Sequence, residues 1–180
     1  MKKIIALTLI FSSFSTLMFA QKSGKKNVVK INPFGLFFGN ASLSYERALN
    51  DKNSVVISPT FGDLKVDNYK YSSFGLGAEY RFYTREEAPE GFYLSPGVGF
   101  SSGKVKLENS TSNNEANSTG IYIKGVLGKQ WIWDSGFTLD LNGGIQYANY
   151  KYTGNANSAF NDLRGSGIFP TLSFSLGYNF

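Results

Sequence analysis

Apolar and polar residues alternate with a period of two along most of the chain after residue 27, which is typical of strands with one apolar face. Residues 74–83 and 92–101 show this alternation, and the C-terminus shows it most clearly. There the apolar positions are Ile168, Pro170, Leu172, Phe174, Leu176, Tyr178 and Phe180, and the positions between them are small or polar except Phe169. Apolar spacings of three and four are not found after residue 27, so we expect no helix there.

Turn-forming residues divide this region into eight predicted strands. They span residues 28–38, 41–49, 54–62, 71–83, 91–106, 119–132, 137–152 and 167–180. The connections after the second, fourth and sixth strands are short, whereas residues 63–70, 107–118 and 153–166 form longer polar connections. Short turns at one end and long loops at the other are typical of membrane barrels. The sequence therefore predicts an all-β fold: a closed, antiparallel, eight-stranded transmembrane β-barrel with an up-and-down meander.

The residues on the second face of these strands favour a membrane barrel over a soluble one. They are Gly75, Gly77, Ser95, Gly97, Gly99, Ser173, Ser175 and Gly177. Small residues suit a narrow barrel interior, whereas a strand face in water would carry more Lys, Glu and Thr. Aromatic residues also gather near the short-turn ends, as in an interfacial girdle. These are Tyr80, Phe82, Phe92, Trp131, Trp133, Phe137, Tyr178 and Phe180.

One stretch favours the alternative, a soluble periplasmic or secreted lipocalin-like barrel that binds an apolar ligand. Phe34, Leu36 and Phe38 share the phase of Lys30 and Asn32, so a continuous strand would place large apolar residues on the polar face. A soluble barrel of this kind has large apolar residues inside and polar ones outside.

The N-terminus predicts export. Lys2 and Lys3 precede an apolar stretch that ends at Ala20, and this pattern is typical of a cleaved secretory signal peptide. We therefore expect a signal peptide at residues 1–20, a periplasmic leader at 21–27 and the barrel at 28–180. This organisation predicts a location in the cell outer membrane.

Composition restricts the chemistry. The chain has no Cys and no His, which excludes thiolate metal sites, disulfides and serine–histidine hydrolases. Its 18 basic and 13 acidic residues give a net charge of +5, and removal of Lys2 and Lys3 with the signal peptide leaves +3. This weak and scattered surplus does not indicate nucleic-acid binding. We expect no cofactor, no metal and no enzymatic activity.

Several motifs resemble known outer-membrane families. A terminal Phe180 with Leu172, Phe174, Leu176 and Tyr178 at alternate positions resembles the C-terminal assembly signal of bacterial outer-membrane proteins. The mature chain is similar to small eight-stranded barrels such as outer membrane proteins A and W. Residues 30–47, with Asn32-Pro33 and Tyr45-Glu46-Arg47 as landmarks, resemble the start of uncharacterised Bacteroidetes-type barrels. The resemblance implies outer-membrane lipid and the barrel assembly machinery as partners, and a monomer.

Five charged residues lie out of phase with the apolar positions and are predicted to face the interior. They are Glu46, Glu79, Arg81, Lys124 and Asp140. Charges inside a narrow barrel must pair or meet trapped water. The resemblance to outer membrane protein A implies an interior ion-pair network that plugs, or gates, a narrow passage, and we expect a structural network. No spacing brings two of the three carboxylates together for acid–base catalysis.

The predicted function is therefore a non-enzymatic, porin-like outer-membrane barrel with a structural or surface-interaction role. A narrow passage for small or apolar solutes is a variant of this function that outer membrane protein W-like barrels suggest. The soluble lipocalin-like barrel remains the alternative.

Overall fold

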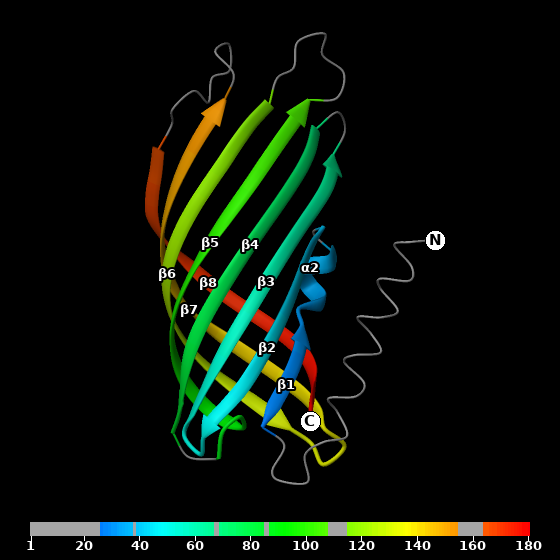
Figure 1. The fold of residues 1–180 in the computed structure, drawn as a ribbon, viewed down its shortest axis with the longest axis vertical. Coiled ribbons are helices and arrows are strands. Elements are labelled where there is room, and N and C mark those ends of the chain that lie inside the picture. The colour runs from blue at the N-terminus through cyan, green and yellow to red at the C-terminus, as the bar shows by residue number, and fades with distance from the viewer. Residues whose placement is uncertain (1–25, 38, 67–68, 85–86, 108–114, 155–163) are drawn as a thin grey trace, which may run out of the picture.

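The computed structural model describes residues 26–37, 39–66, 69–84, 87–107, 115–154 and 164–180, and these form a closed antiparallel barrel (Figure 1). Its eight strands follow one another around the wall in chain order, which confirms the predicted meander. The elements are β1 (Asn27–Ile31), the short helix α2 (Pro33–Phe37), β2 (Asn40–Asn50), β3 (Asn53–Val66), β4 (Tyr69–Tyr83), β5 (Gly91–Leu107), β6 (Glu115–Ile132), β7 (Phe137–Gly154) and β8 (Arg164–Asn179).

The wall closes where β1 pairs with β8. Following paired residues from Val29 through β2 to β7 leads to Ile168 on β8, whereas Val29 itself pairs with Tyr178. One circuit of the wall thus ends on β8 ten residues away from the residue that pairs with Val29. This stagger of the strands is linked to their tilt relative to the barrel axis. Asn27 and Phe180 extend the seam by exchanging two backbone hydrogen bonds of 3.0 and 2.8 Å.

The two ends of the barrel differ. The short connections after β2, β4 and β6 lie at one end together with the C-terminus, which we call the lower end after its place in Figure 1. The strands of the opposite, upper end reach beyond β1 and β2, because β1 has 5 residues and β2 has 11, whereas β6 and β7 have 18 each.

Side chains are distributed in the reverse of a water-soluble barrel. Large apolar residues on the outer face are exposed, among them Leu172 at 87% and Ile168 at 70%, whereas polar and charged residues are buried inside. The alternation predicted for residues 74–83 and 92–101 is present, with Phe74, Leu94 and Val98 outside and with glycine, serine, charged and tyrosine residues inside. Among the described residues, the interior is mainly polar and charged, whereas the lipocalin-like alternative requires an apolar interior.

The predicted strand at residues 28–38 is wrong in its second half. The chain leaves the sheet after Ile31 and forms α2, so the expectation of no helix after residue 27 is also wrong. The local signal was Asn32-Pro33: the Asn32 side chain accepts a hydrogen bond of 3.1 Å from the Gly35 amide, and Pro33 occupies the first helical position. The change from strand to helix explains the phase shift of Phe34 and Leu36.

Helix α2 stands where the upper half of β1 would otherwise lie. Among the described residues, β8 pairs with β1 only from Leu176 to Asn179, so its upper part pairs with β7 alone. The helix contacts both β2 and β8, and the Phe34 ring packs edge-on against Phe174 at 5.2 Å between centroids. A helix satisfies its own backbone hydrogen bonds and can therefore replace a strand in an apolar environment.

The upper strands are longer than predicted. Residues 63–70 are not a long loop, because β3 continues to Val66 and β4 begins at Tyr69. Similarly, β6 begins at Glu115 and β7 ends at Gly154. The polar residues in these segments led to the prediction of loops. Backbone hydrogen bonds between neighbouring strands do not require apolar side chains, so these strands continue through the polar segments. The predicted signal peptide at residues 1–20 lies outside the described residues.

Two glycines on neighbouring strands give a matched test of this packing. A Cβ at Gly144 would collide with the Gly125 carbonyl oxygen and with the Val126 backbone, whereas a Cβ at Gly125 would meet nothing within 4 Å. We expect Gly144→Ala to lower the free energy of unfolding by about 1 to 3 kcal/mol. Gly125→Ala should leave it unchanged. Urea titration, read from the gel mobility of unboiled samples, measures both; equal effects would contradict the described β6–β7 register.

Candidate functional site

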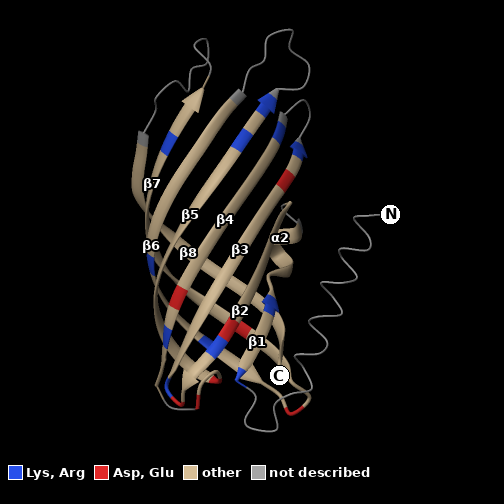
Figure 2. Ribbon diagram, viewed as in Figure 1, with Lys and Arg blue, Asp and Glu red and all other residues tan. Residues whose placement is uncertain are grey.

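Four charged side chains meet inside the lower half of the barrel. The Lys30 ammonium lies 2.6 Å from Glu46 Oε2 and 2.6 Å from Asp140 Oδ2, and Arg81 Nη1 lies 3.1 and 2.8 Å from the same two oxygens. Two cations therefore bridge two carboxylates that come from β2 and β7. Figure 2 shows these charges gathered low in the barrel. All four side chains are at least 97% buried.

Neutral donors and acceptors complete this cluster. Ser54 and Tyr83 donate hydrogen bonds of 2.5 and 2.6 Å to Glu46 Oε1, and Tyr93 donates one of 2.6 Å to Asp140 Oδ1. The Lys30 ammonium also donates to Gln130 Oε1 at 2.6 Å. Buried charges are tolerated only when they are paired and hydrogen-bonded in this way.

A second ion pair lies on the upper side of the first cluster. Lys124 Nζ is 2.6 Å from Glu79 Oε1, and Arg81 Nη2 is 3.5 Å from Glu79 Oε2, so Arg81 joins the two clusters. The Arg81 guanidinium also lies 4.1 Å from the centre of the Tyr93 ring. Together the six charges, three of each sign, form what we call the interior network: Lys30, Glu46, Glu79, Arg81, Lys124 and Asp140.

A polar space of about 110 Å³ borders the interior network. Hydroxyl groups of β2, β3 and β8 line it, among them Ser44, Ser58 and Ser175. The Arg81 Nε–H is buried and has no hydrogen-bond partner among the described protein atoms. This space is large enough for water molecules, which can satisfy such a donor.

Residues 87–90, in the connection between β4 and β5, cover the lower end of the network. Pro89 is buried there, and its carbonyl oxygen accepts a hydrogen bond from the Gln130 side chain. Ala88 packs against Tyr83, Tyr93 and Val126, and its amide donates to the Asp51 carbonyl oxygen at 2.9 Å. The lower mouth is thus filled by side chains and by a folded turn.

The structure places all five sequence-derived charged residues inside the barrel and brings them into one network. Glu46 and Asp140 approach each other through shared cations, which the sequence offered no spacing to predict. Sequence reasoning missed Lys30 because the predicted strand was continued through Phe38. In a continuous strand, Lys30 would share its face with large apolar residues, so it was not assigned to the polar interior. It also missed Gln130, Tyr83 and Tyr93, although each alternates with an outward apolar residue such as Leu94 or Phe82.

The network does not have the arrangement of an acid–base or metal site. Both central carboxylates are held by two cations each, so neither is free to accept a proton from a substrate. Within the described ranges, no group of three or more His, Cys, Asp or Glu residues could hold a metal ion. The described part of the chain also has no helix long and apolar enough to cross a membrane.

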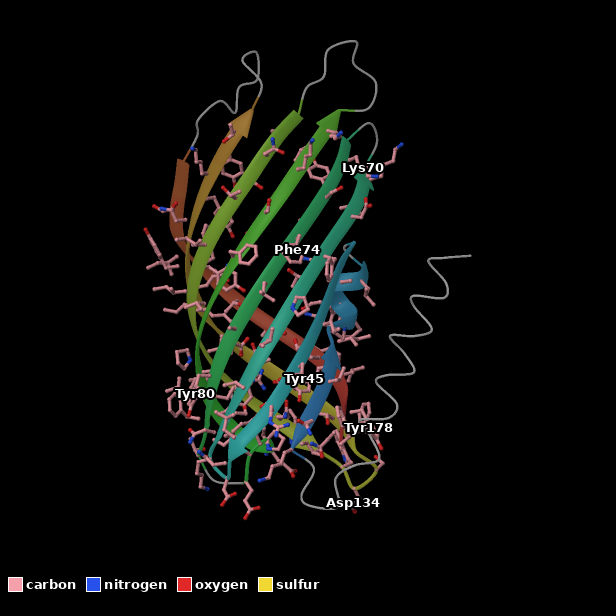
Figure 3. All side chains as sticks on the ribbon, in the orientation of Figure 1. Tyr45, Lys70, Phe74, Tyr80, Asp134 and Tyr178 are labelled. Atoms are coloured by element: carbon pink, nitrogen blue, oxygen red, sulfur yellow. The ribbon has the colours of Figure 1, made fainter. Side chains whose placement is uncertain are left out.

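The residues of the resembled C-terminal signal lie on β8 and just after it. Leu172 and Tyr178 are exposed on the outer face, and Phe174 packs against α2. Phe180 pairs with Asn27 at the seam, as described above. Figure 3 shows Tyr178 near the lower end, on the same side of the barrel as Tyr45.

Comparison with known proteins adds a family. Residues 6–167 match DUF3575, which is described as a family of proteins of unknown function. The chain belongs to this family. No curated protein matches the sequence. Among solved structures, this DUF3575 member is similar to the translocator domain of the autotransporter NalP from Neisseria meningitidis, with 12% identity, a TM-score of 0.49, and coverage of 97% of this chain and 69% of that one.

Lys30→Met tests whether the network holds the barrel together. Without the ammonium, Glu46 and Asp140 share one cation, and removal of one partner from a buried pair costs about 3 to 5 kcal/mol. We expect a loss of this size in the free energy of unfolding, measured by urea titration. Lys151→Met, at an exposed position on β7, is the control and should change it by less than about 0.5 kcal/mol.

A compensating change sharpens this test. Lys30→Met combined with Asp140→Asn removes one charge of each sign and should recover part of the lost stability. A double variant that is less stable than Lys30→Met alone would show that the ion pairs are not what Lys30 contributes.

Proposed function

We propose that this DUF3575 member is a non-enzymatic β-barrel protein of the bacterial outer membrane with a structural or surface-interaction role in the envelope. The observation that carries this proposal is the reversed distribution of side chains. A belt of exposed apolar residues surrounds a charged interior, and a bilayer is the environment in which such a belt is stable.

The extent of the belt supports this location. Exposed apolar side chains occur on the outer face of every strand, from Ile57 on β3 through Leu94, Ile123 and Ile145 to Leu172 on β8. Soluble monomers rarely expose continuous apolar patches of more than a few hundred Å². An apolar belt around the full circumference is therefore better explained by lipid than by a single protein partner.

The interior network supports a closed barrel over an open pore. The lower half is filled by the six charges, by two buried tyrosines and one buried glutamine around them, and by the turn at Ala88 and Pro89. An eight-stranded barrel is narrow enough to be filled by side chains. The protein then acts through its surface, and the upper end of the barrel is the end that would face outward.

One observation favours a second candidate, a lateral passage for small apolar solutes. Above Ile31 the wall between β2 and β8 is formed by α2 in place of a strand, and the polar space is bordered on that side by Ser42, Ser44, Ser173 and Ser175. Displacement of α2 would connect this space with the surrounding lipid. The apolar Phe34 and Leu36, both exposed, suit such a position in the wall.

Biogenesis would follow from the C-terminal strand. We propose that the barrel assembly machinery recognises β8 with its terminal Phe180, and that the barrel then works as a monomer in outer-membrane lipid. The chain would reach this machinery after export and removal of the predicted signal peptide.

Leu172→Lys separates a lipid environment from water. Because Leu172 is 87% exposed, Lys at this position would be harmless in water, but at the middle of a bilayer it costs about 2 to 4 kcal/mol. We expect a correspondingly smaller heat-modifiable fraction in the membranes of cells that express the variant. Thr153→Lys, at an exposed position near the upper end of β7, is the control. Equal yields of both variants, with the protein in the soluble fraction, would refute the proposal.

Planar-bilayer recordings distinguish the closed barrel from the passage. We expect the wild-type barrel to show no steady conductance, because the interior network and the lower turn fill the lumen. Stable openings of the wild type would contradict the sealed interior. Binding of a short-chain alcohol or fatty acid that is lost when α2 is cross-linked to β8 through Phe34→Cys and Phe174→Cys would support the lateral passage.

A further inference from the structure

Small residues line the lumen above the interior network. Along the register from β3 to β7, the row that contains Glu79 and Lys124 is followed by two rows in which tyrosine is the one large residue. The lower row consists of Ser58, Gly77, Gly99, Tyr122 and Ala148, and the upper row consists of Thr60, Gly75, Ser101, Gly120 and Tyr150. Side chains of this size do not fill the lumen as the charges and tyrosines of the lower half do.

The two tyrosine rings lie against the wall. A Cβ at Gly99 would collide with the Tyr122 ring, and a Cβ at Gly120 would collide with the Tyr150 ring. Each ring therefore covers the glycine that is paired with its own residue on the neighbouring strand. This position keeps both rings out of the centre of the lumen.

The polar space of about 110 Å³ lies at the foot of this lumen. We call it the hydroxyl cup, because its lining includes Ser42, Ser44, Ser58, Thr60, Tyr122 and Ser173. Arg81 also lines the cup and is only 3% exposed, and its Nε–H has no hydrogen-bond partner among the described protein atoms. Such a buried donor costs free energy until an oxygen atom accepts its hydrogen. The cup therefore offers an unpartnered donor to whatever occupies it.

The charges around the hydroxyl cup balance. Its lining includes Lys30, Arg81 and Lys124 together with Glu79 and Asp140. Glu46, the sixth member of the interior network, bonds to both Lys30 and Arg81. An added ion would find no free counter-charge among these described groups, and an unpaired charge is costly away from bulk water. The cup therefore favours a ligand without net charge.

Hydroxyl groups are the ligand groups that match this lining. A hydroxyl both donates and accepts, so it can pair with the serine, threonine and tyrosine hydroxyls and can accept from the Arg81 Nε–H. An apolar solute would leave that donor unpaired. The volume of the cup is several times the share of one water molecule in the liquid, which is about 30 Å³, so a chain of a few hydroxyl-bearing carbons fits.

We propose that the hydroxyl cup binds a small neutral polyol, one oxygen of which accepts the hydrogen bond from Arg81 Nε–H. The polyol replaces water molecules and reproduces their hydrogen bonds. The interior network and the turn at Ala88 and Pro89 close the lower end, so the cup holds its ligand and does not conduct it. This inference goes beyond the proposed surface role and does not depend on where in the cell the barrel lies.

Polyol binding by the mature, full-length barrel tests the proposal. The barrel is purified in a polyoxyethylene detergent, which has no sugar headgroup, and is titrated with sorbitol while saturation-transfer NMR measures the dissociation constant. We expect saturable binding. Tyr122→Phe/Thr60→Val removes two lining hydroxyls and keeps the shape of both side chains. It should weaken sorbitol binding about 25-fold, since each lost hydrogen bond contributes roughly a factor of five.

The same two substitutions on the outer face are the control. Tyr147 of β7 and Thr119 of β6 are exposed there, so Tyr147→Phe/Thr119→Val should leave the dissociation constant unchanged. Heat-modifiable gel mobility checks that both double variants fold. Equal losses in the two variants, or an unchanged affinity in Tyr122→Phe/Thr60→Val, would overturn the assignment to the cup.

Charged analogues test the class of ligand. Gluconate and glucamine share the six-carbon polyol chain of sorbitol but carry a negative and a positive charge. Both should bind at least about tenfold more weakly than sorbitol, because neither charge finds a free counter-charge. Tighter binding of gluconate would show an anion site instead, and no saturable binding of sorbitol would show that the cup holds water alone; either result overturns the proposal. Because these measurements use purified barrel in detergent, neither result bears on the proposed membrane location, which cell fractionation tests separately.

Discussion

The pairing of six charged side chains inside the barrel, four of them fully buried, is the constraint on which the rest of the structure depends. Lys30 and Arg81 each bridge Glu46 and Asp140, so one ammonium and one guanidinium group join residues from β1, β2, β4 and β7. Lys30 comes from β1, the shortest strand. Its position in the network explains how five residues are enough to close the wall at the seam with β8.

Charges inside require apolar residues outside. Each strand alternates between the two environments, so an inward Glu46 or Arg81 fixes the outward direction of Tyr45 and Phe82. In water this arrangement would be unfavourable on the outer face, because its large apolar side chains would stay exposed. In a bilayer, the outer apolar side chains contact acyl chains, and strand pairing satisfies the backbone hydrogen bonds everywhere except at the gap above β1. Helix α2 covers part of that gap with a self-satisfied backbone.

Much of this architecture could be predicted from the sequence, because period-two alternation reports directly on the two faces of a strand. The phase of Leu172, Phe174 and Leu176 against Ser173 and Ser175 is enough to place β8. The network was predicted in part: the phase shows that Glu46 and Asp140 point inward, but contact between them depends on the stagger of the whole barrel, which no local pattern encodes. Lys30 was missed for a local reason, since the helix signal at Asn32-Pro33 was not recognised and the strand was continued past it.

The central claim is that the outer face of this barrel contacts lipid acyl chains, and tryptophan fluorescence tests it most directly. The chain has two tryptophans, Trp131 and Trp133, both near the lower end, and Trp133 is exposed beside Phe137. In vesicles with brominated acyl chains we expect strong quenching, greater for bromines near the headgroups than for bromines at the bilayer centre. Fluorescence that is the same in brominated and unbrominated vesicles would contradict the account.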